Sequence, residues 1–248
     1  MGGLSVSLGL GPHKALLNDS NPHLVNMYRQ LRDGLRVTVE FLNDKETFYA
    51  YRARFNQRVR AGEAQTPEGA QLFYYLNRTG FNGLCRFNSK GEFNVPMGRY
   101  ATIDYEDTVS FRRYRQILTG WDFMDAGDFS DVRVAAEDFI YADPPYDAAF
   151  TGYDKHGFSW ADQQRLAEHL AKHRGPVVAS NHSTERITSL YHDLGFTVHI
   201  LDAPRRINCT GDRSPAPEML ATHNLPCSAT DQKETCSHCN LTLHGTPD

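Results

Sequence analysis

The stretch DFIYADPPY at residues 138–146 constrains the fold of this chain more than any other segment. An apolar run that is typical of a buried strand ends there in a carboxylate, two prolines and a tyrosine. Proline has no backbone N–H to donate to a neighbouring strand, so the strand has to end at Asp143. The sequence therefore predicts a core strand that ends in a stiff turn carrying an acid and an aromatic ring.

The remaining segments predict an α/β fold. A glycine pair precedes a short strand at residues 15–17, and an acid follows that strand, an order that suggests a nucleotide-cofactor half-site. Ser159 and Asp162 have the spacing of a capping box at the start of a later helix. Further strands are expected at residues 121–129, 138–142, 177–179, 196–201 and 218–222, and helices at residues 24–35, 160–173 and 187–194. Strands that alternate with helices imply a layered domain with a mainly parallel sheet.

Charge is unevenly distributed along the chain. The formal net charge is −4, yet residues 51–115 hold eleven Lys and Arg against six Asp and Glu. Residues 46–115 are also rich in arginine and aromatic side chains and show little strand alternation, so we expect a mostly helical insertion there. A basic segment in an acidic protein indicates a local phosphate-binding surface. The arginines of YRARFNQRVR, taken alone, could equally form a solvated helix face.

Other features limit the function classes. No apolar run approaches the length of a membrane span, and the first residues lack the layout of a signal peptide. Five cysteines, three of them in the last 22 residues, do not form a disulfide framework, so a cytoplasmic location is expected. The tail from residue 225 is polar and is expected to be disordered. Its Cys-x-x-Cys pair lacks the spacing of a structural zinc site, so no metal is expected.

The motif from Asp143 to Tyr146 has the parts that are needed to grip an aromatic amine. In an open α/β sheet, ligands bind beyond the carboxyl ends of the strands. The tyrosine ring can stack there on a planar base, while the carboxylate and a backbone carbonyl accept the two hydrogens of an amino group. These hydrogen bonds draw the nitrogen lone pair out of conjugation, so the nitrogen can attack an electrophilic methyl group. The motif alone is equally compatible with a strand-ending turn that a tyrosine covers.

Several separated motifs together resemble one family. Asp143-Pro144-Pro145-Tyr146 is similar to the catalytic motif of amino-methyltransferases, in the form typical of enzymes that act on adenine in DNA. The segment FYYLNRTGFNGLCRFNSKGEFNVPMGRY at residues 73–100 resembles the recognition segment of Dam-type DNA adenine methyltransferases. Residues 17–21, 180–182 and 205–222 resemble further segments of that family. The resemblance covers residues 2–224 in the family's order.

This resemblance implies a fold, a cofactor and a set of site residues. The fold would be a Rossmann-like methyltransferase sheet, built from residues 1–45 and 116–224, with residues 46–115 inserted as a mostly helical DNA-recognition domain. The cofactor would be S-adenosylmethionine. Gly2 and Gly3 match the cofactor loop, where a side chain would block close backbone approach. Asp19 matches the acid that accepts the ribose hydroxyls, although it could also form only an Asx turn. Asp128 and Phe129 match the pair that borders the cofactor's adenine, although Phe129 could be plain core packing.

The implied catalytic residues are Asp143, Pro144, Pro145 and Tyr146, with Asp143 also bordering the cofactor. Reaching an adenine amino group inside a duplex requires flipping the nucleotide out of the stack. Phe81 matches an aromatic wedge that would fill the gap, although it could instead be a buried ring under a glycine turn. The expected DNA-binding residues are Phe81, Asn82, Leu84, Arg86, Asn88 and Arg99. Arg86 is expected to read a guanine edge, whereas Arg99, Arg112 and Arg113 are expected to meet phosphates.

The implied function is methyl transfer to adenine in a short duplex target, with GATC as a guess and a restriction enzyme as a possible cognate partner. One alternative is an inactive DNA-binding remnant. Another is an enzyme that methylates RNA adenine or a glutamine side chain, and such enzymes more often have Asn at the position of Asp143. Family members carry a further segment ahead of Gly2, including a strand central in their sheet. We therefore expect the 248-residue chain as written to bind cofactor weakly and to have little activity.

Overall fold

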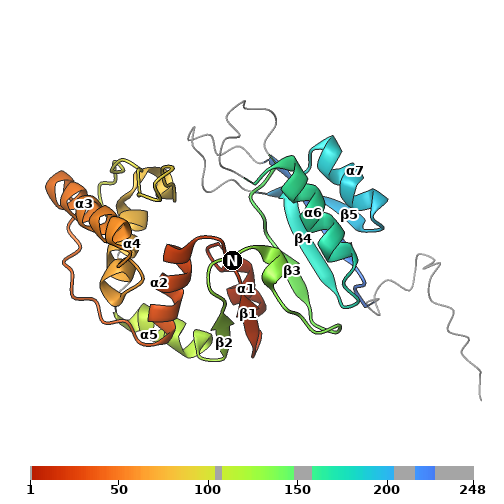
Figure 1. Ribbon diagram of the computed structural model, residues 1–248, viewed down its shortest axis with the longest axis horizontal. Coiled ribbons are helices and arrows are strands. Elements are labelled where there is room, and N and C mark those ends of the chain that lie inside the picture. Colours follow the sequence, from red (N-terminus) through yellow and green to blue (C-terminus); the bar gives the residue numbers. More distant parts are fainter. Residues whose placement is uncertain (1, 104–107, 148–157, 204–215, 227–248) are drawn as a thin grey trace, which may run out of the picture.

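The computed structural model describes residues 2–103, 108–147, 158–203 and 216–226 (Figure 1). The predicted disordered tail, its Cys-x-x-Cys pair and most of the segment at 205–222 lie outside these residues. The helices are α1 (Ser5–Leu10), α2 (Pro22–Arg32), α3 (Lys45–Ala61), α4 (Pro67–Thr79), α5 (Thr108–Leu118), α6 (Trp160–Ala171) and α7 (Glu185–Asp193). The strands are β1 (Ala15–Leu17), β2 (Trp121–Phe123), β3 (Ile140–Ala142), β4 (Val177–His182), β5 (Thr197–Ala203) and β6 (Ala216–His223). Two short 3-10 helices are η1 (Phe81–Gly83) and η2 (Phe129–Asp131).

The described strands form two sheets rather than the single, mainly parallel sheet expected from the sequence. One sheet pairs β1 with β2 in parallel, and the other has the order β3-β4-β6-β5. Only the β3–β4 pair of the larger sheet is parallel, because β6 runs antiparallel to both of its neighbours. No helix was expected between the strands at 196–201 and 218–222, and strands without a crossover helix pair antiparallel. β6 is thus the strand that departs from the mainly parallel arrangement expected.

Helices α6 and α7 pack on one face of the four-stranded sheet. Leu166 and Leu170 of α6, together with Ile187 and Tyr191 of α7, are buried in one cluster with apolar side chains of β4 and β6. The predicted capping box is confirmed, because the Asp162 backbone N–H donates to Ser159 Oγ and the Ser159 N–H donates to Asp162 Oδ2. Side chains alternate between the two faces of a strand, so Asn181 of β4 points toward α6 while Ser180 points away from it.

Residues 46–115, predicted to be a mostly helical insertion, contain most of α3, all of α4 and the first part of α5. Helices α3 and α4 pack around a cluster of aromatic side chains at the opposite end of the molecule from the four-stranded sheet (Figure 1). Buried rings from Phe48, Phe55, Phe73 and Tyr75 dominate this cluster. The predicted boundary at residue 115 falls within α5, whose Leu118 packs instead in the cluster formed by α2, β1 and β2.

Candidate functional site

Two carboxylates predicted to serve different ligands lie on either side of Gly2. Asp19 follows β1 and Asp143 follows β3, so they stand at the carboxyl ends of strands from the two sheets. The Gly2 N–H donates to Asp19 Oδ2 at 3.0 Å, and a Cβ on Gly2 would lie 3.9 Å from Asp143 Oδ2. Gly2 also has a φ of +51°, which residues with a side chain rarely adopt. The structure thus brings three sequence-predicted residues together, whereas a Cβ on Gly3 would instead meet Ser5 Oγ of α1, at 3.8 Å.

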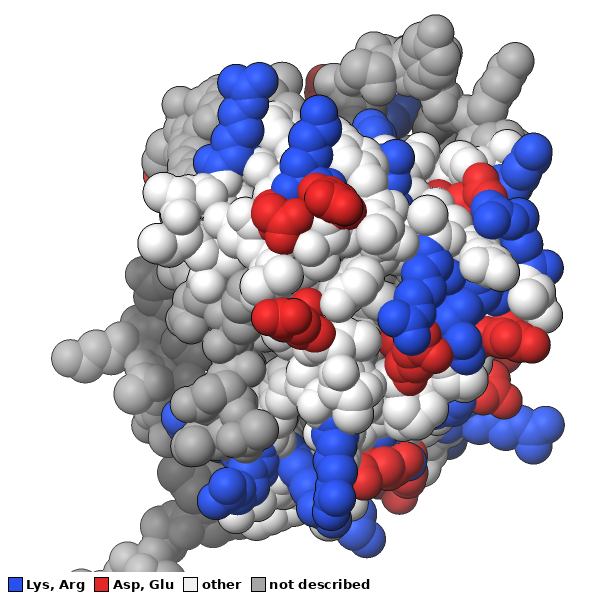
Figure 2. All heavy atoms as spheres, turned by 90° about the vertical axis from the view of Figure 1, so that its left-hand side faces the viewer, with Lys and Arg blue, Asp and Glu red and all other residues white. Residues whose placement is uncertain are grey.

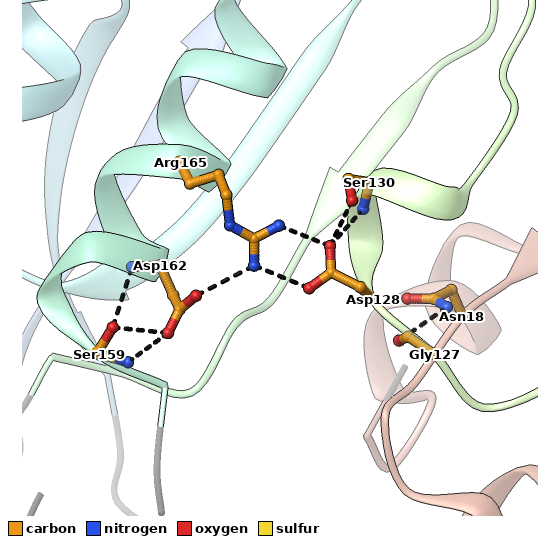
Figure 3. A network of polar contacts seen from close by, with 7 residues as sticks. All are labelled: Asn18, Gly127, Asp128, Ser130, Ser159, Asp162 and Arg165. Carbon is orange, nitrogen blue, oxygen red and sulfur yellow. Dashed lines mark hydrogen bonds and ion pairs between the residues drawn. The ribbon is translucent and has the colours of Figure 1, made fainter.

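Asp19 is held by its own turn. The Asn21 N–H donates to Asp19 Oδ1 at 2.9 Å, so the Asx turn considered from the sequence is present. The loop after β2 is attached to the same corner, because the Gly127 N–H donates to the Asp19 carbonyl at 3.3 Å. Asn18 Nδ2 in turn donates to the Gly127 carbonyl at 3.4 Å (Figure 3). These bonds place the Asp128 segment beside the end of β1.

Asp128 and Phe129 have a partner that the sequence did not suggest, Arg165 of α6. The Arg165 guanidinium donates to both Asp128 oxygens, at 2.7 and 2.8 Å, and to Asp162 at 3.0 Å (Figure 3). It also lies 4.3 Å from the centre of the Phe129 ring. The hydrogen bonds from Arg165 and Ser130 hold the pKa of Asp128 well below its usual range. The network therefore ties the loop after β2 to α6, and so one sheet to the other.

Asp143 is exposed and is oriented by a hydroxyl chain. Ser180 Oγ donates to Asp143 Oδ1 at 3.0 Å, and Tyr141 Oη lies 3.1 Å from Ser180 Oγ. Because Ser180 occupies Oδ1, the second carboxylate oxygen faces the Gly2 side of the turn. Sequence reasoning missed Tyr141, although its position two residues before Asp143 places both side chains on one face of the strand.

Tyr146 lies between a histidine and a second carboxylate. Its hydroxyl donates to Glu218 Oε2 at 3.3 Å, and its ring meets the edge of His182 at 5.1 Å. Burial, and then the negative charges of Asp143 and Glu218, raise the pKa of the Tyr146 phenol. The phenol is therefore a neutral donor, and its half-buried ring is fixed at both ends. The sequence had not predicted a role for Glu218 either.

The predicted DNA-facing residues lie on the loop between α4 and residue 100. Two isolated bridges, Gly80 to Met97 and Phe87 to Phe93, close this loop. Phe81 begins η1 beside the Gly80–Met97 bridge with 39% of its surface exposed, and Asn82 has a left-handed φ of +52°. Leu84 instead packs against the aromatic cluster of α3 and α4. Phe81 is therefore not the buried ring that the sequence left open.

Two polar residues of this loop differ in what their side chains do. Arg86 is exposed, and its Nε donates to Asn94 Oδ1 at 2.8 Å. Asn88 is occupied with its own turn, because its Oδ1 accepts the N–H groups of Lys90 and Glu92 and its Nδ2 donates to Glu92. The structure therefore leaves Arg86 as the better placed of the two to reach a base edge.

Most arginines of the α3 segment have protein partners. Arg54 and Arg58 both bind Glu68 of α4, and Arg60 binds Glu92 at 2.5 Å. Arg52 donates to the Val95 carbonyl at 3.1 Å. Figure 2 accordingly shows this end of the molecule with basic and acidic side chains beside one another rather than as one basic surface. Arg52 and Arg60 hold α3 on the loop at residues 80–100, and Arg54 and Arg58 hold it on α4. Arg99, Arg112 and Arg113 are exposed.

Two further findings concern the described residues alone. Within the described ranges, no group of three or more His, Cys, Asp or Glu side chains is placed to hold a metal ion. None of the helices described here combines the length and apolar character that crossing a membrane requires.

Comparison with known proteins gives consistent matches. The family model for D12 class N6 adenine-specific DNA methyltransferase matches residues 1–207. Retron Ec67 DNA adenine methylase of Escherichia coli is 34% identical over 224 residues, which cover 86% of this chain and 76% of that protein. Type II methyltransferase M1.LlaDCHI of Lactococcus lactis subsp. cremoris is 33% identical over 241 residues, with 90% and 84% covered. DNA adenine methylase of Vibrio cholerae serotype O1 is 35% identical over 240 residues, with 89% and 84% covered.

Proposed function

This chain belongs to the D12 class of N6 adenine-specific DNA methyltransferases, and from that premise we propose how its residues divide the work of methyl transfer. Enzymes of this class methylate the exocyclic amino group of adenine in DNA and depend on S-adenosylmethionine. When bound, S-adenosylmethionine supplies the methyl group, carried on a positively charged sulfur. The observation that carries the assignment is the convergence of Asp19 and Asp143 on the two sides of Gly2.

The corner around Gly2 fits the cofactor. A side chain on Gly2 would project toward Asp143 Oδ2, into the space between the ribose-binding acid and the acid that grips the base. Each Asp19 oxygen accepts one backbone N–H, which orients the carboxylate that would accept the ribose hydroxyls. The Phe129 ring, backed by Arg165, is the aromatic surface for the cofactor's adenine.

Asp143 and Tyr146 would act on the target adenine. Ser180 fixes one Asp143 oxygen, so the other can accept a hydrogen from the amino group while a motif carbonyl accepts the second. Tyr146 would stack on the base. As the nitrogen–carbon bond forms, the carbon–sulfur bond would break and its electron pair would stay on sulfur. The methylated nitrogen would then release its extra proton, and the Asp143 carboxylate would accept it.

Duplex DNA is the substrate that the loop at residues 80–100, the recognition loop, would hold. Phe81, exposed beside the bridge that closes this loop, would fill the space that the flipped adenine leaves, and Arg86 would contact a base edge. We infer an active enzyme rather than the inactive remnant, or the chain of little activity, that the sequence left open, because Asp19 and Asp143 meet at Gly2 and Tyr146 follows in the same turn as Asp143. RNA adenine and glutamine are not favoured either, because the related proteins named above are DNA adenine methylases or a type II methyltransferase. GATC as the target and a cognate restriction enzyme stay predictions.

The assignment is tested by the position of the transferred methyl group. We expect tritiated methyl from S-adenosylmethionine to appear as N6-methyladenine in duplex DNA after digestion to nucleosides. Single-stranded DNA of the same sequence, duplex RNA and the protein itself serve as parallel acceptors. Label recovered as a methylated cytosine, or on the protein, would show that the assignment is wrong.

Arg99 and Arg86 are expected to affect DNA binding differently. Arg99→Ala should weaken binding to all sequences alike and lower the slope of log affinity against log salt by about 1, because it removes a phosphate contact. Arg86→Ala should relax the preference at one base pair by about 1–3 kcal/mol. Fluorescence anisotropy with a set of single-substituted duplexes measures both.

The control for this pair is Arg174→Ala, which removes an exposed charge ahead of β4, at the opposite end of that strand from the site. It should leave both the salt slope and the sequence preference unchanged. A uniform loss of affinity for Arg86→Ala across all duplexes would contradict its base-reading role.

A further inference from the structure

Two buried amide side chains bind the backbone of the turn that carries the catalytic motif. Gln163 of α6 is 1% exposed and Asn181 of β4 is 0% exposed, although both lie beside an apolar core. Burying an amide is unfavourable unless its hydrogen-bonding groups are satisfied. Gln163 Nε2 donates to the Pro145 carbonyl at 2.8 Å, and Asn181 Nδ2 donates to Gln163 Oε1 at 3.0 Å. Asn181 Oδ1 accepts the Asp147 N–H at 2.9 Å.

The direction of this chain of hydrogen bonds is fixed by its two ends. The Pro145 carbonyl can only accept, so the NH2 group of Gln163 must face it. The Asp147 N–H can only donate, so the oxygen of Asn181 must face it. The remaining amide groups then meet as donor and acceptor without conflict. Each side chain thus has one orientation only, and together they clamp the backbone on both sides of Tyr146.

Asp147 is anchored independently on the far side of the turn. Its carboxylate accepts from Arg186 Nε at 2.6 Å and from Thr184 Oγ1 at 3.0 Å, and its carbonyl accepts from His182 Nδ1 at 2.8 Å. The turn is therefore attached to α6, to β4 and to the start of α7. Its substrate-facing groups, the Asp143 carboxylate and the Tyr146 ring, lie outside this network of buried bonds.

We propose that Gln163 and Asn181 are positioning residues for methyl transfer: they fix the backbone on either side of Tyr146, so that its ring and Asp143 meet the target adenine in the reactive geometry. This inference rests on the proposed function of Asp143 and Tyr146. Neither amide touches substrate. Methyl transfer requires the attacking nitrogen, the methyl carbon and the sulfur to be aligned, and a displacement of about 1 Å can lower the rate roughly a hundredfold. A binding surface tolerates the same displacement far better.

Gln163→Glu tests the clamp with almost no change of size. The variant keeps the oxygen that accepts from Asn181, but it replaces the donor to the Pro145 carbonyl by a carboxylate oxygen. We expect kcat to fall roughly ten- to hundredfold, while the Kd for duplex DNA and the KM for S-adenosylmethionine change less than about threefold. The loss should shrink as the pH falls, because the carboxyl group that this substitution introduces can, once protonated, again donate to the Pro145 carbonyl.

The matched control is Gln164→Glu, the same chemical change at an exposed neighbouring position of α6. It should show the wild-type kcat and the wild-type pH profile. Gln163→Met provides a second, uncharged variant of similar size, in case the buried carboxylate prevents folding. It should melt cooperatively and show the loss of kcat without the recovery at low pH.

The outcomes separate this inference from the proposed function. A wild-type enzyme that methylates adenine, with folded Gln163 variants that keep its kcat, overturns the positioning role alone. A loss of kcat that matches the unfolded fraction of each variant also overturns it, because a purely structural role predicts that result. A wild-type enzyme that transfers no methyl group to DNA overturns both.

Discussion

Asp143→Ala is expected to lower kcat by about a thousandfold or more while leaving the affinity for duplex DNA nearly unchanged. Asp143 is exposed, and among the described residues its carboxylate is bound by Ser180, so its loss removes little from the fold. It is, however, the acceptor that would draw the adenine lone pair out of conjugation and take up the released proton. Losing such a group costs about 10²–10⁴ in rate. Single-turnover methylation and DNA titration, measured side by side, test both parts of this expectation.

Asp122→Ala is a suitable control for this variant, because Asp122 is an exposed acid on β2 outside the motif. It should keep the wild-type kcat. Asp143→Ala protein that retains more than about a tenth of the wild-type turnover would contradict the role of Asp143 as the amine acceptor. A complete loss of DNA binding would contradict it as well, since the recognition loop lies on other elements.

The parts of the fold that were predictable depend on local chemistry. The proline pair ended β3 where expected, and the Ser159–Asp162 spacing gave the start of α6. Both signals act within a few residues, so the sequence alone contains them. The place of β6 between β4 and β5 was not predictable in this way, because strand order depends on which edges remain free once the other strands have paired.

The candidate site, like the fold, was predictable only in part. Gly2, Asp19, Asp128, Phe129 and the catalytic motif were predicted because the segments that carry them resemble motifs of one family, and the catalytic motif also follows a strand end. Arg165 was missed, because it reaches Asp128 across 37 residues of sequence and two different elements. Gln163 was missed because a polar residue in the first turns of an amphipathic helix is usually solvated. Only the packing of α6 against the end of β4 places it under the motif.

Arg186→Met is expected to lower the free energy of unfolding by about 3 kcal/mol, whereas Arg165→Met should lower it far less. Both arginines donate two hydrogen bonds to an aspartate, and both lie over an aromatic ring, Trp160 and Phe129 respectively. The two ion pairs differ in how deeply the aspartate side chain is buried. The Asp147 side chain is 6% exposed, whereas the Asp128 side chain is 40% exposed.

The reason for this difference is the acid that remains after the substitution. Without Arg165, Asp128 is hydrated and keeps its bonds from Ser130. Without Arg186, Asp147 stays buried with a charge that Thr184 alone cannot compensate. We place the expected cost at the lower end of the range for buried pairs, because Arg186 itself is 38% exposed. Methionine keeps the apolar packing of the arginine stem, so the comparison isolates the charge.

Urea unfolding of the two variants measures the difference, and the double variant Arg186→Met with Asp147→Asn identifies its cause. If the buried charge is responsible, removing it should restore part of the lost stability, because the two changes are coupled through one contact. Equal losses for Arg186→Met and Arg165→Met would contradict the argument from burial. Because Asp147 directly follows Tyr146, a weakened anchor should also lower kcat at temperatures where the protein remains folded. Stability and catalysis would then depend on the same ion pair, through the turn that carries the motif.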